Sequence, residues 1–439
     1  MRMNRRAILY LYLLLLIIII ILNKIIGFSI PILLVDVVVV IFAVLMDKDE
    51  LLVSLAFLLP LASCFEASTH IWLIYVIALL AKRVKVNASF VLFLSIFVIL
   101  EMIAHIYYGV SDLNRVINYL FTFAMFIILI TNKDQIVFDK MMKMYCLAIP
   151  LLIVFYILSA VSSGNTDVFN ALFVDGARFG GTAGEEFSGM SININANTMA
   201  YYCISCISMT IVLLKRNILK TWQKTFYVIL LFFSVLFGIS TGSRTFIITL
   251  VLCVFLCLVS SLRDKKRVLI SIIAFLSLCG IGVILINSNI PVIDATMARF
   301  ERSDVSSMNG RTDILTEYME KFQSSESFWA LGSGVNGYMI IYDSDMAIHN
   351  GIIQVLICCG MFGFLAFLAL IIKPLFSAIR RRISFYNYIP LIVCFLFLQT
   401  IQLLSPSLLL FPFALAYLPI LQDGCIIATR DDRQNSDFA

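Results

Sequence analysis

Three arginines stand apart from the other charged residues of this 439-residue chain because of the sequence around them. Arg178 precedes Phe-Gly-Gly, Arg244 lies in Thr-Gly-Ser-Arg-Thr between two apolar runs, and Arg311 opens a stretch with apolar residues at helical spacing. A guanidinium group grips phosphate or carboxylate through two parallel hydrogen bonds. We therefore expect these arginines to bind an anion, although an arginine at a membrane boundary can also snorkel to the interface or pair with a neighbouring acid.

His349 and Asn350 come directly before another apolar run, which Gly360-Met-Phe-Gly363 then breaks. Imidazole takes or gives a proton near neutral pH, so His349 is a candidate for orienting or deprotonating a hydroxyl group. Gly332-Ser-Gly334 is a weak signal for a loop whose backbone approaches a phosphate, since glycine turns are common.

Two other polar pairs have simpler interpretations. Glu101 and His105 are four residues apart in an apolar run, and we interpret them as a satisfied contact inside the membrane. Asp343 and Asp345 have the spacing of a metal-binding pair, but so do many solvated loops, and we expect no metal. All of the 11 cysteines except Cys425 lie in apolar runs, so we expect no disulfide framework.

The elements that must position these residues are membrane helices. Hydrophobic residues make up 61% of the chain and charged residues 13%, and mean hydropathy is +1.00. Soluble domains are about half apolar and a quarter charged. An apolar run of about 20 residues crosses the hydrocarbon core as a helix, and these runs do not alternate as barrel strands do. We predict an all-α polytopic membrane protein with 12–14 transmembrane helices and two long extracytoplasmic loops.

The predicted spans follow from the apolar runs, and the third and fourth are short enough to form one re-entrant pair or a tilted hairpin. They are residues 7–22, 30–46, 51–65, 70–81, 88–108, 115–131, 144–161, 196–214, 225–241, 245–262, 268–286, 348–372, 385–403 and 407–421.

Positive charge in the connections orients these spans, because cytoplasmic loops are rich in Lys and Arg. With the N-terminus inside, most of the 32 basic residues fall in cytoplasmic connections. No small-residue cleavage site follows the first run, so we expect it to remain as a helix. We therefore predict that both termini are cytoplasmic and that the two long loops face outside.

The chain divides accordingly into six segments. We predict N-terminal transmembrane helices at 1–161, a first outer loop at 162–195, central transmembrane helices at 196–286, a large outer loop at 287–347 with an amphipathic helix at 310–322, C-terminal transmembrane helices at 348–421 and a cytoplasmic tail at 422–439. Asn195 is expected to cap the helix that follows the first loop. Loops this long are uncommon unless they are functional, which places the chemistry on the outer side.

These motifs together resemble the superfamily of O-antigen ligases and Wzy-type polysaccharide polymerases of the bacterial envelope. The likeness covers about residues 170–370, and Asn195-Ala-Asn197 lacks the proline often found there. The matching pieces, in order and all on the predicted outer side, are Arg178-Phe-Gly-Gly with Asn195–Asn197, Gly242-Ser-Arg244, Gly310-Arg311, Gly332-Ser-Gly334 and His349-Asn350.

The resemblance implies a membrane-embedded, GT-C-like glycosyltransferase that needs no metal and no cofactor. Its donor would be a glycan on undecaprenyl pyrophosphate and its acceptor a sugar hydroxyl. Arg244 and Arg311 would stabilise the negative charge on the departing pyrophosphate, and His349 would orient or deprotonate the attacking hydroxyl. The substrate-binding residues so implied are Arg178, Arg244, Arg311, Asn350, Gly332 and Gly334.

Among the activities of this superfamily we favour a polymerase that joins repeat units into O-antigen, capsule or exopolysaccharide chains at the outer face of the bacterial inner membrane. The alternative is a ligase that transfers the chain to lipid A core, with the same donor contacts. Membrane lipid, a chain-length regulator and a flippase are candidate partners, and nucleic acid is not. A glycan flippase, the alternative from another class, would have two related halves, whereas here one half holds both long loops.

Overall fold

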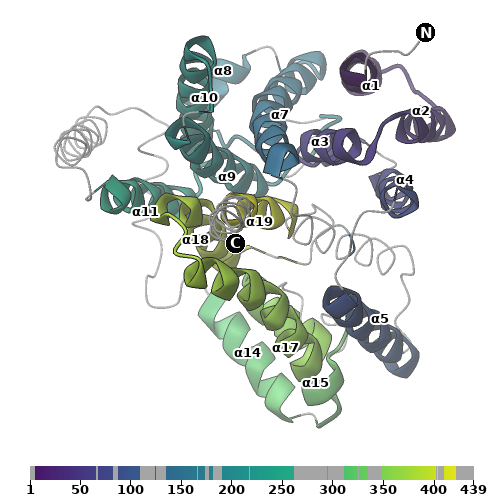
Figure 1. Ribbon diagram of the computed structural model, residues 1–439, viewed down its shortest axis with the longest axis vertical. Coiled ribbons are helices and arrows are strands. Elements are labelled where there is room, and N and C mark those ends of the chain that lie inside the picture. Colours follow the sequence, from purple (N-terminus) through teal and green to yellow (C-terminus); the bar gives the residue numbers. More distant parts are fainter. Residues whose placement is uncertain are drawn as a thin grey trace, which may run out of the picture.

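The helices of a computed structural model account for all regular structure in the part of the chain that it describes (Figure 1). Each of the predicted spans at 115–131 and 268–286 has only one described residue or none. The described residues are 5–65, 68–82, 88–108, 124, 135–165, 167–173, 177–180, 190–216, 218–261, 294, 311–324, 326–334, 348–401, 403 and 410–421.

Most of the helices lie on predicted apolar runs, but the helix at 135–162 begins nine residues before the run at 144–161, and the helix at 351–380 ends eight residues after the run at 348–372. The helices are α1 (Arg5–Ile20) with the π-turn η1 (Ile21–Ile25), α2 (Ile32–Leu45), α3 (Lys48–Leu58), η2 (Ala62–Cys64), α4 (Ser68–Ala81), α5 (Ala88–Tyr108), α7 (Gln135–Ser162), α8 (Val168–Phe173), α9 (Ala196–Lys215), α10 (Thr221–Ser240), α11 (Arg244–Ser261), α14 (Arg311–Ser324), α15 (Glu326–Leu331), α17 (Gly351–Arg380), η3 (Phe385–Tyr388), α18 (Ile389–Phe397), η4 (Leu398–Thr400) and α19 (Leu410–Ala416).

Membrane-spanning length is reached by six helical stretches among the described residues. These are 7–25, 137–162, 196–215, 221–240, 244–261 and 351–380. Shorter apolar helices cover 32–45, 70–81, 95–107, 385–400 and 412–421. The chain is therefore an all-α, multi-pass membrane protein, as predicted.

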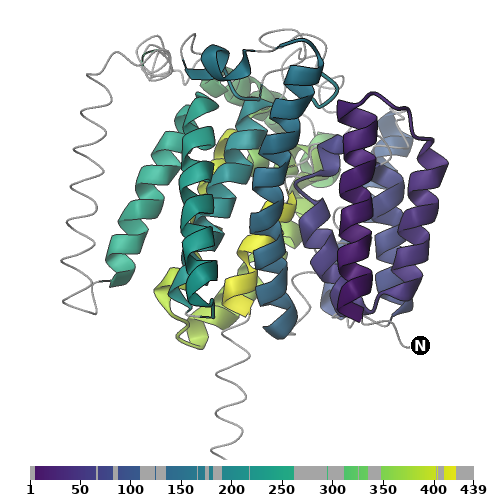
Figure 2. The ribbon, with the colours of Figure 1, turned by 90° about the horizontal axis from the view of Figure 1, so that it is seen from above.

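Two groups of helices are visible. In Figure 2, α7, α9 and α10 stand side by side with similar axes, and α11 leans away next to them. In Figure 1, α14, α15 and α17 lie together beside α5. The second group therefore joins a predicted outer-loop segment, 311–331, to two membrane helices.

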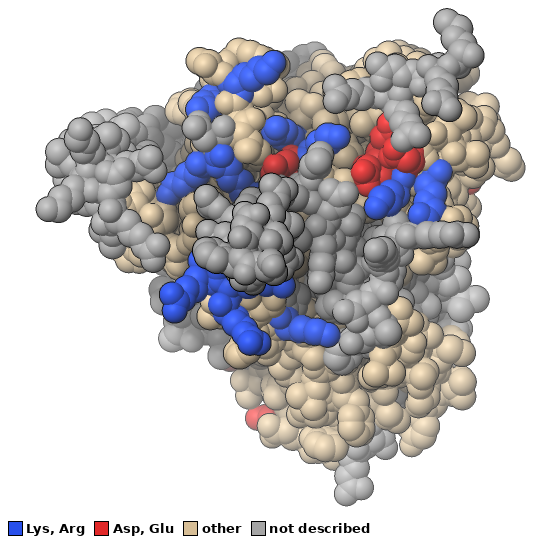
Figure 3. Space-filling model, viewed as in Figure 1, with Lys and Arg blue, Asp and Glu red and all other residues tan. Residues whose placement is uncertain are grey.

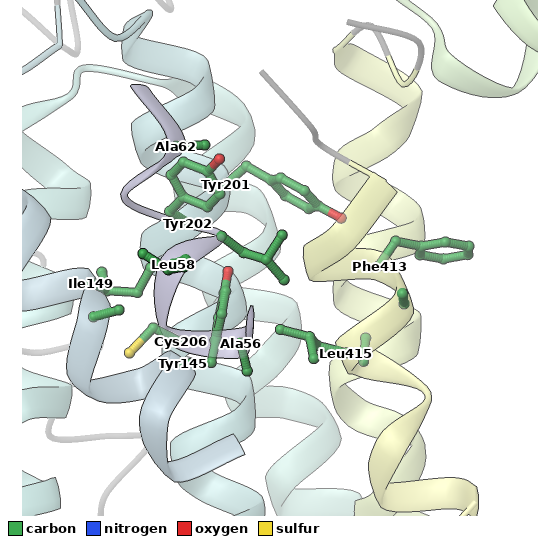
Figure 4. Packing of buried hydrophobic residues seen from close by; sticks show 14 of the residues in the cluster. Ala56, Leu58, Ala62, Tyr145, Ile149, Tyr201, Tyr202, Cys206, Phe413 and Leu415 are labelled. Atoms are coloured by element: carbon green, nitrogen blue, oxygen red, sulfur yellow. The ribbon is translucent and has the colours of Figure 1, made fainter. Parts of the chain in front are cut away.

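Helix α9 is the centre of the first group. It packs against α7, α10, α11 and α18, and most of its side chains are buried. Figure 4 shows Tyr201, Tyr202 and Cys206 of α9 between side chains of α3, α7 and α19. The buried hydroxyl of Tyr145 on α7 bonds to Ser205 Oγ at 2.6 Å, so a polar group in this apolar core has a partner.

Two polar residues cap the starts of helices. Asp47 caps α3, with its carboxylate accepting from the amides of Asp49 and Glu50 at 3.1 and 3.0 Å. Asn195 caps α9, accepting from the amide of Asn197 at 2.8 Å, which confirms the predicted cap.

One end of the bundle gathers basic side chains, which Figure 3 shows on a single face. Lys215 ends α9, Lys220 precedes α10, and Arg380 ends α17. Arg216 is mostly buried there: it contacts Asp139 Oδ1 at 3.3 Å, and donates to Asn387 Oδ1 at 2.8 Å and to Pro419 O at 2.6 Å. This arginine ties the start of α7 and the end of α9 to η3 and the segment after α19.

Candidate functional site

The turn between α10 and α11 presents Arg244 as the first residue of α11. Thr241 is buried; its hydroxyl donates to Gly238 O at 2.6 Å and accepts from the amide of Ser243 at 3.3 Å. Gly242 has φ +60°, a conformation that glycine adopts without strain. The Thr-Gly-Ser sequence therefore closes a tight turn that leaves Arg244 half-buried at its end.

Arg178 docks on this same turn. Its Nε donates to Thr241 O at 3.2 Å, and the amide of Phe179 donates to Ser240 O at 2.9 Å. The Phe179 ring is fully buried, 5.0 Å from the Phe237 ring on α10. The structure thus brings together two predicted site residues, Arg178 and Arg244, that are far apart in the sequence.

At Gly180 the same loop segment packs closely against the start of α9. Its φ is +83°, and a Cβ added there would lie 3.0 Å from Ala196 Cα and 3.1 Å from Ile194 O. Its amide donates to the hydroxyl of Tyr156 on α7 at 3.2 Å. The backbone at this glycine, two residues after Arg178, therefore lies close to the start of α9.

His349 and Asn350 lie at the start of α17. Asn350 Oδ1 accepts from the amides of Ile352 and Ile353 at 3.2 and 3.1 Å, so Asn350 is the N-cap of this helix. His349, just outside the helix, is exposed. Gly351 packs closely, since an added Cβ would lie 3.0 Å from Leu398 O in η4.

The same central helix supports both parts of the candidate site. The Tyr201 ring on α9 lies 5.2 Å from the Phe397 ring, and Phe397 directly precedes the Leu398 carbonyl on which Gly351 packs. Tyr201 is six residues after Asn195, about 9 Å along the axis of an α-helix. The start of α17 therefore connects, through α18, to the N-terminal third of α9.

Arg311 begins α14, as its position before the amphipathic pattern predicts. Tyr318 and Phe322 of this helix are buried while Glu317 and Glu320 are exposed, which is the pattern of an amphipathic helix. The side chain of Arg311 lies outside the described part of the structure. Its approach to Arg178 and Arg244 stays a prediction.

Gly332 and Gly334 lie against a break in α17. At Gly360 the backbone has φ +64° and ψ −175°, which interrupts the helix where the glycines of the sequence predict. A continuous helix would pair the carbonyls of Ile357 and Cys358 with amides four residues later. At this break the amides of Ser333 and Gly334 donate to these carbonyls at 3.0 and 2.9 Å.

The loop and the break fit only because both contain glycine. A Cβ on Gly332 would lie 2.3 Å from Gly360 N, and one on Gly360 would lie 2.4 Å from Ala330 O. We call residues 332–334 the splint. Sequence reasoning expected a phosphate loop here and missed this pairing, for which the glycines in both segments were the only signal. Phosphate binding by Gly332 and Gly334 stays a prediction.

The chemistry available at the α10–α11 turn is anion binding. Arg178 bonds through Nε to Thr241 O in the turn that leads into Arg244, the first residue of α11, and a helix N-terminus also favours negative charge. No group of three or more His, Cys, Asp and Glu residues that could hold a metal ion occurs within the described ranges.

Comparison with known proteins gives one family. Residues 226–368 match a protein-family model described as O-antigen ligase. The match includes Arg244, Arg311, the splint and His349-Asn350, and it leaves Arg178 outside. No curated protein matches the chain. The resemblance to the superfamily of O-antigen ligases and Wzy-type polymerases is confirmed over this segment.

Proposed function

We propose that this chain, whose residues 226–368 match the O-antigen ligase family model, is a membrane glycosyltransferase that polymerises polyprenyl-pyrophosphate-linked oligosaccharide units. The observation that carries the proposal is the docking of Arg178 on the turn that bears Arg244. Positive charge on the predicted outer side is rare in this chain, and here the fold concentrates two arginines at one turn. A pyrophosphate is an anion that matches such a pair.

The reaction would be a displacement at the anomeric carbon of the donor sugar. The oxygen of an acceptor hydroxyl forms the new glycosidic bond, the bond from the anomeric carbon to pyrophosphate breaks, and the hydroxyl proton leaves to a base. Arg178, Arg244 and Arg311 would stabilise the charge on the departing polyprenyl pyrophosphate. His349, exposed at the start of α17, would accept or direct the proton.

The site would face the outside of the inner membrane. The basic end of the bundle, with Lys215, Lys220 and Arg380, supports a cytoplasmic location for that end, because positive loops stay inside. The turn with Arg244 lies at the opposite end of α10. Both termini would then be cytoplasmic, as the charge pattern predicts.

Asn193→Cys and Ser384→Cys variants test this orientation, since both positions are exposed and lie near opposite ends of the bundle. A membrane-impermeant maleimide is expected to label position 193 in intact spheroplasts, and position 384 only after permeabilisation. The unmodified chain is the control for labelling of native cysteines. Labelling of position 384 alone in intact spheroplasts would show that the orientation is the opposite one, and it would contradict an outward-facing site.

Complementation of a polymerase-deficient strain, with surface glycan length on a gel, tests the activity. The intact chain should restore a ladder of repeats, and His349→Ala should leave mainly single-repeat product, with a loss of at least about 100-fold as for other catalytic proton-transfer groups. Ser384→Ala, an exposed change outside the site, is the matched control. A full ladder from His349→Ala at equal membrane expression would remove His349 from the mechanism.

An O-antigen ligase is the second candidate, because the matched family carries that description. A ligase would use the same donor contacts and differ in its acceptor. In the same strains it would attach preformed chains to lipid A core without changing their length. Attachment without a new ladder would therefore select the ligase over the polymerase.

A further inference from the structure

Glu101 is an acidic residue on a membrane helix, α5, outside the segment matched by the O-antigen ligase family. Its neighbours on one stripe of α5, Phe97, Leu100 and Ala104, are buried, whereas Met102 and Ile106 on the other stripe are exposed. Glu101 therefore lies on the protein-facing side. An ionisable side chain inside a membrane is energetically unfavourable and usually has a function.

The Glu101 carboxylate lies against the splint. A Cβ added to Gly334 would be 3.3 Å from Glu101 Oε1 and 3.4 Å from Ala104 Cβ. The same face of α5 packs on α17 beside the break, since a Cβ added to Gly363 would lie 3.2 Å from Leu100 Cδ1 and 3.6 Å from Phe97 Cε1. Glu101 thus stands where three segments meet: α5, the splint and the break.

This junction sets the direction of the outer half of α17, residues 351–359. The amides of Ser333 and Gly334 in the splint bond to the carbonyls of Ile357 and Cys358, directly before the break. His349 and Asn350 immediately precede this half-helix. Gly351, at the start of this half-helix, packs on Leu398 O in η4, so a change in direction at the break would move His349 relative to that contact.

We propose that Glu101 is a positioning residue of the transferase: it braces the splint from α5, and through the splint it holds the half-helix that begins after His349 and Asn350. Its catalytic consequence rests on the proposed function, because it acts through His349. The brace itself, a contact between Glu101 and the splint, does not depend on which reaction the chain performs.

The kinetic test compares three variants of the purified protein in liposomes with lipid-linked repeat units. Glu101→Ala should lower kcat at least about tenfold while the donor KM changes little, because small displacements of catalytic groups affect the chemical step. Glu101→Gln keeps the shape and an acceptor oxygen and should restore kcat to within about threefold. Asp36→Asn is the matched control. Asp36 is a half-buried acidic residue on α2 whose carboxylate pairs with His70 at 3.0 Å, and its variant should behave as the unmodified protein.

Native cysteines give a second readout that needs no activity. Cys358 and Cys359 are 1% and 5% exposed at the junction, and Cys146 and Cys206 are buried between α7 and α9. With membrane-permeant N-ethylmaleimide and peptide mass spectrometry, Glu101→Ala should label Cys358 or Cys359 at least about threefold faster, as local opening of a packed segment predicts. Labelling of Cys146 and Cys206 should not change.

Each outcome decides the proposal. Unchanged kcat and unchanged labelling in Glu101→Ala would overturn it. Faster labelling at all four cysteines would assign Glu101 to general stability and also overturn it. Glutamine keeps the shape of the side chain. If Glu101→Gln is as impaired as Glu101→Ala, that shape is not what supports the splint, and the proposal is contradicted. If the unmodified protein transfers no glycan, the proposed function fails, and labelling alone then decides whether Glu101 braces the junction.

Discussion

Arg244→Ala is expected to reduce glycan transfer at least about 100-fold at unchanged membrane expression, the usual effect of removing one group that stabilises transition-state charge. Arg244 is the first residue of α11, on the turn to which Arg178 Nε donates at 3.2 Å. Removing its guanidinium leaves the departing pyrophosphate with less compensating charge. The measurement is the initial rate with a lipid-linked repeat unit in liposomes.

Two further variants separate charge from geometry. Arg244→Lys keeps the charge but not the planar fork and should keep only part of the rate. Arg380→Ala removes an exposed arginine at the opposite end of the bundle and should leave the rate unchanged. If Arg244→Ala is as active as Arg380→Ala, the guanidinium has a snorkelling role and the pyrophosphate site lies elsewhere.

Gly332→Ala is expected to prevent accumulation of folded protein. A Cβ there would lie 2.3 Å from Gly360 N and 2.4 Å from Cys358 O, both backbone atoms that cannot swing aside, and φ is +74°. Together the overlap and the left-handed backbone should destabilise the fold by more than about 3 kcal/mol. Membrane-fraction yield and thermal unfolding in detergent measure this.

Gly164→Ala is the matched control because it separates strain from overlap. Gly164 also has positive φ, +93°, but an added Cβ would meet nothing within 4 Å. The free energy of unfolding of Gly164→Ala should therefore fall by only about 1–2 kcal/mol, the strain of a left-handed residue. Equal losses in Gly332→Ala and Gly164→Ala would mean that the splint does not pack against the break as described.

The membrane architecture could be predicted from the sequence because hydrocarbon imposes one strict requirement: long apolar helices with internally bonded backbone. The run at 196–214 became α9 to within one residue, and the run at 225–241 became α10, which begins four residues earlier. Local signals also succeeded. Asn195 caps α9, and Gly360 breaks α17, because each depends only on the chemistry of that residue and its neighbours.

The contacts between distant segments could not be predicted in the same way. Nothing in the local sequence says that Arg178 bonds to Thr241, 63 residues away, or that the splint pairs with the carbonyls of Ile357 and Cys358. Glycine signals that backbone can approach closely, but not which backbone or ligand approaches. The Gly332-Ser-Gly334 motif therefore suggested a phosphate, whereas the segment it contacts in the structure is a broken helix of the same chain.

The most direct test of the account is to reconstitute the purified protein in liposomes with undecaprenyl-pyrophosphate-linked repeat units, and to measure chain length and released undecaprenyl pyrophosphate together. We predict that lipid-linked chains of two or more repeats appear, with one undecaprenyl pyrophosphate released per bond formed, and that neither product appears with Arg244→Ala. Unchanged single repeats and no released lipid, from folded protein supplied with both donor and acceptor, would contradict the proposal that this chain is a polymerase.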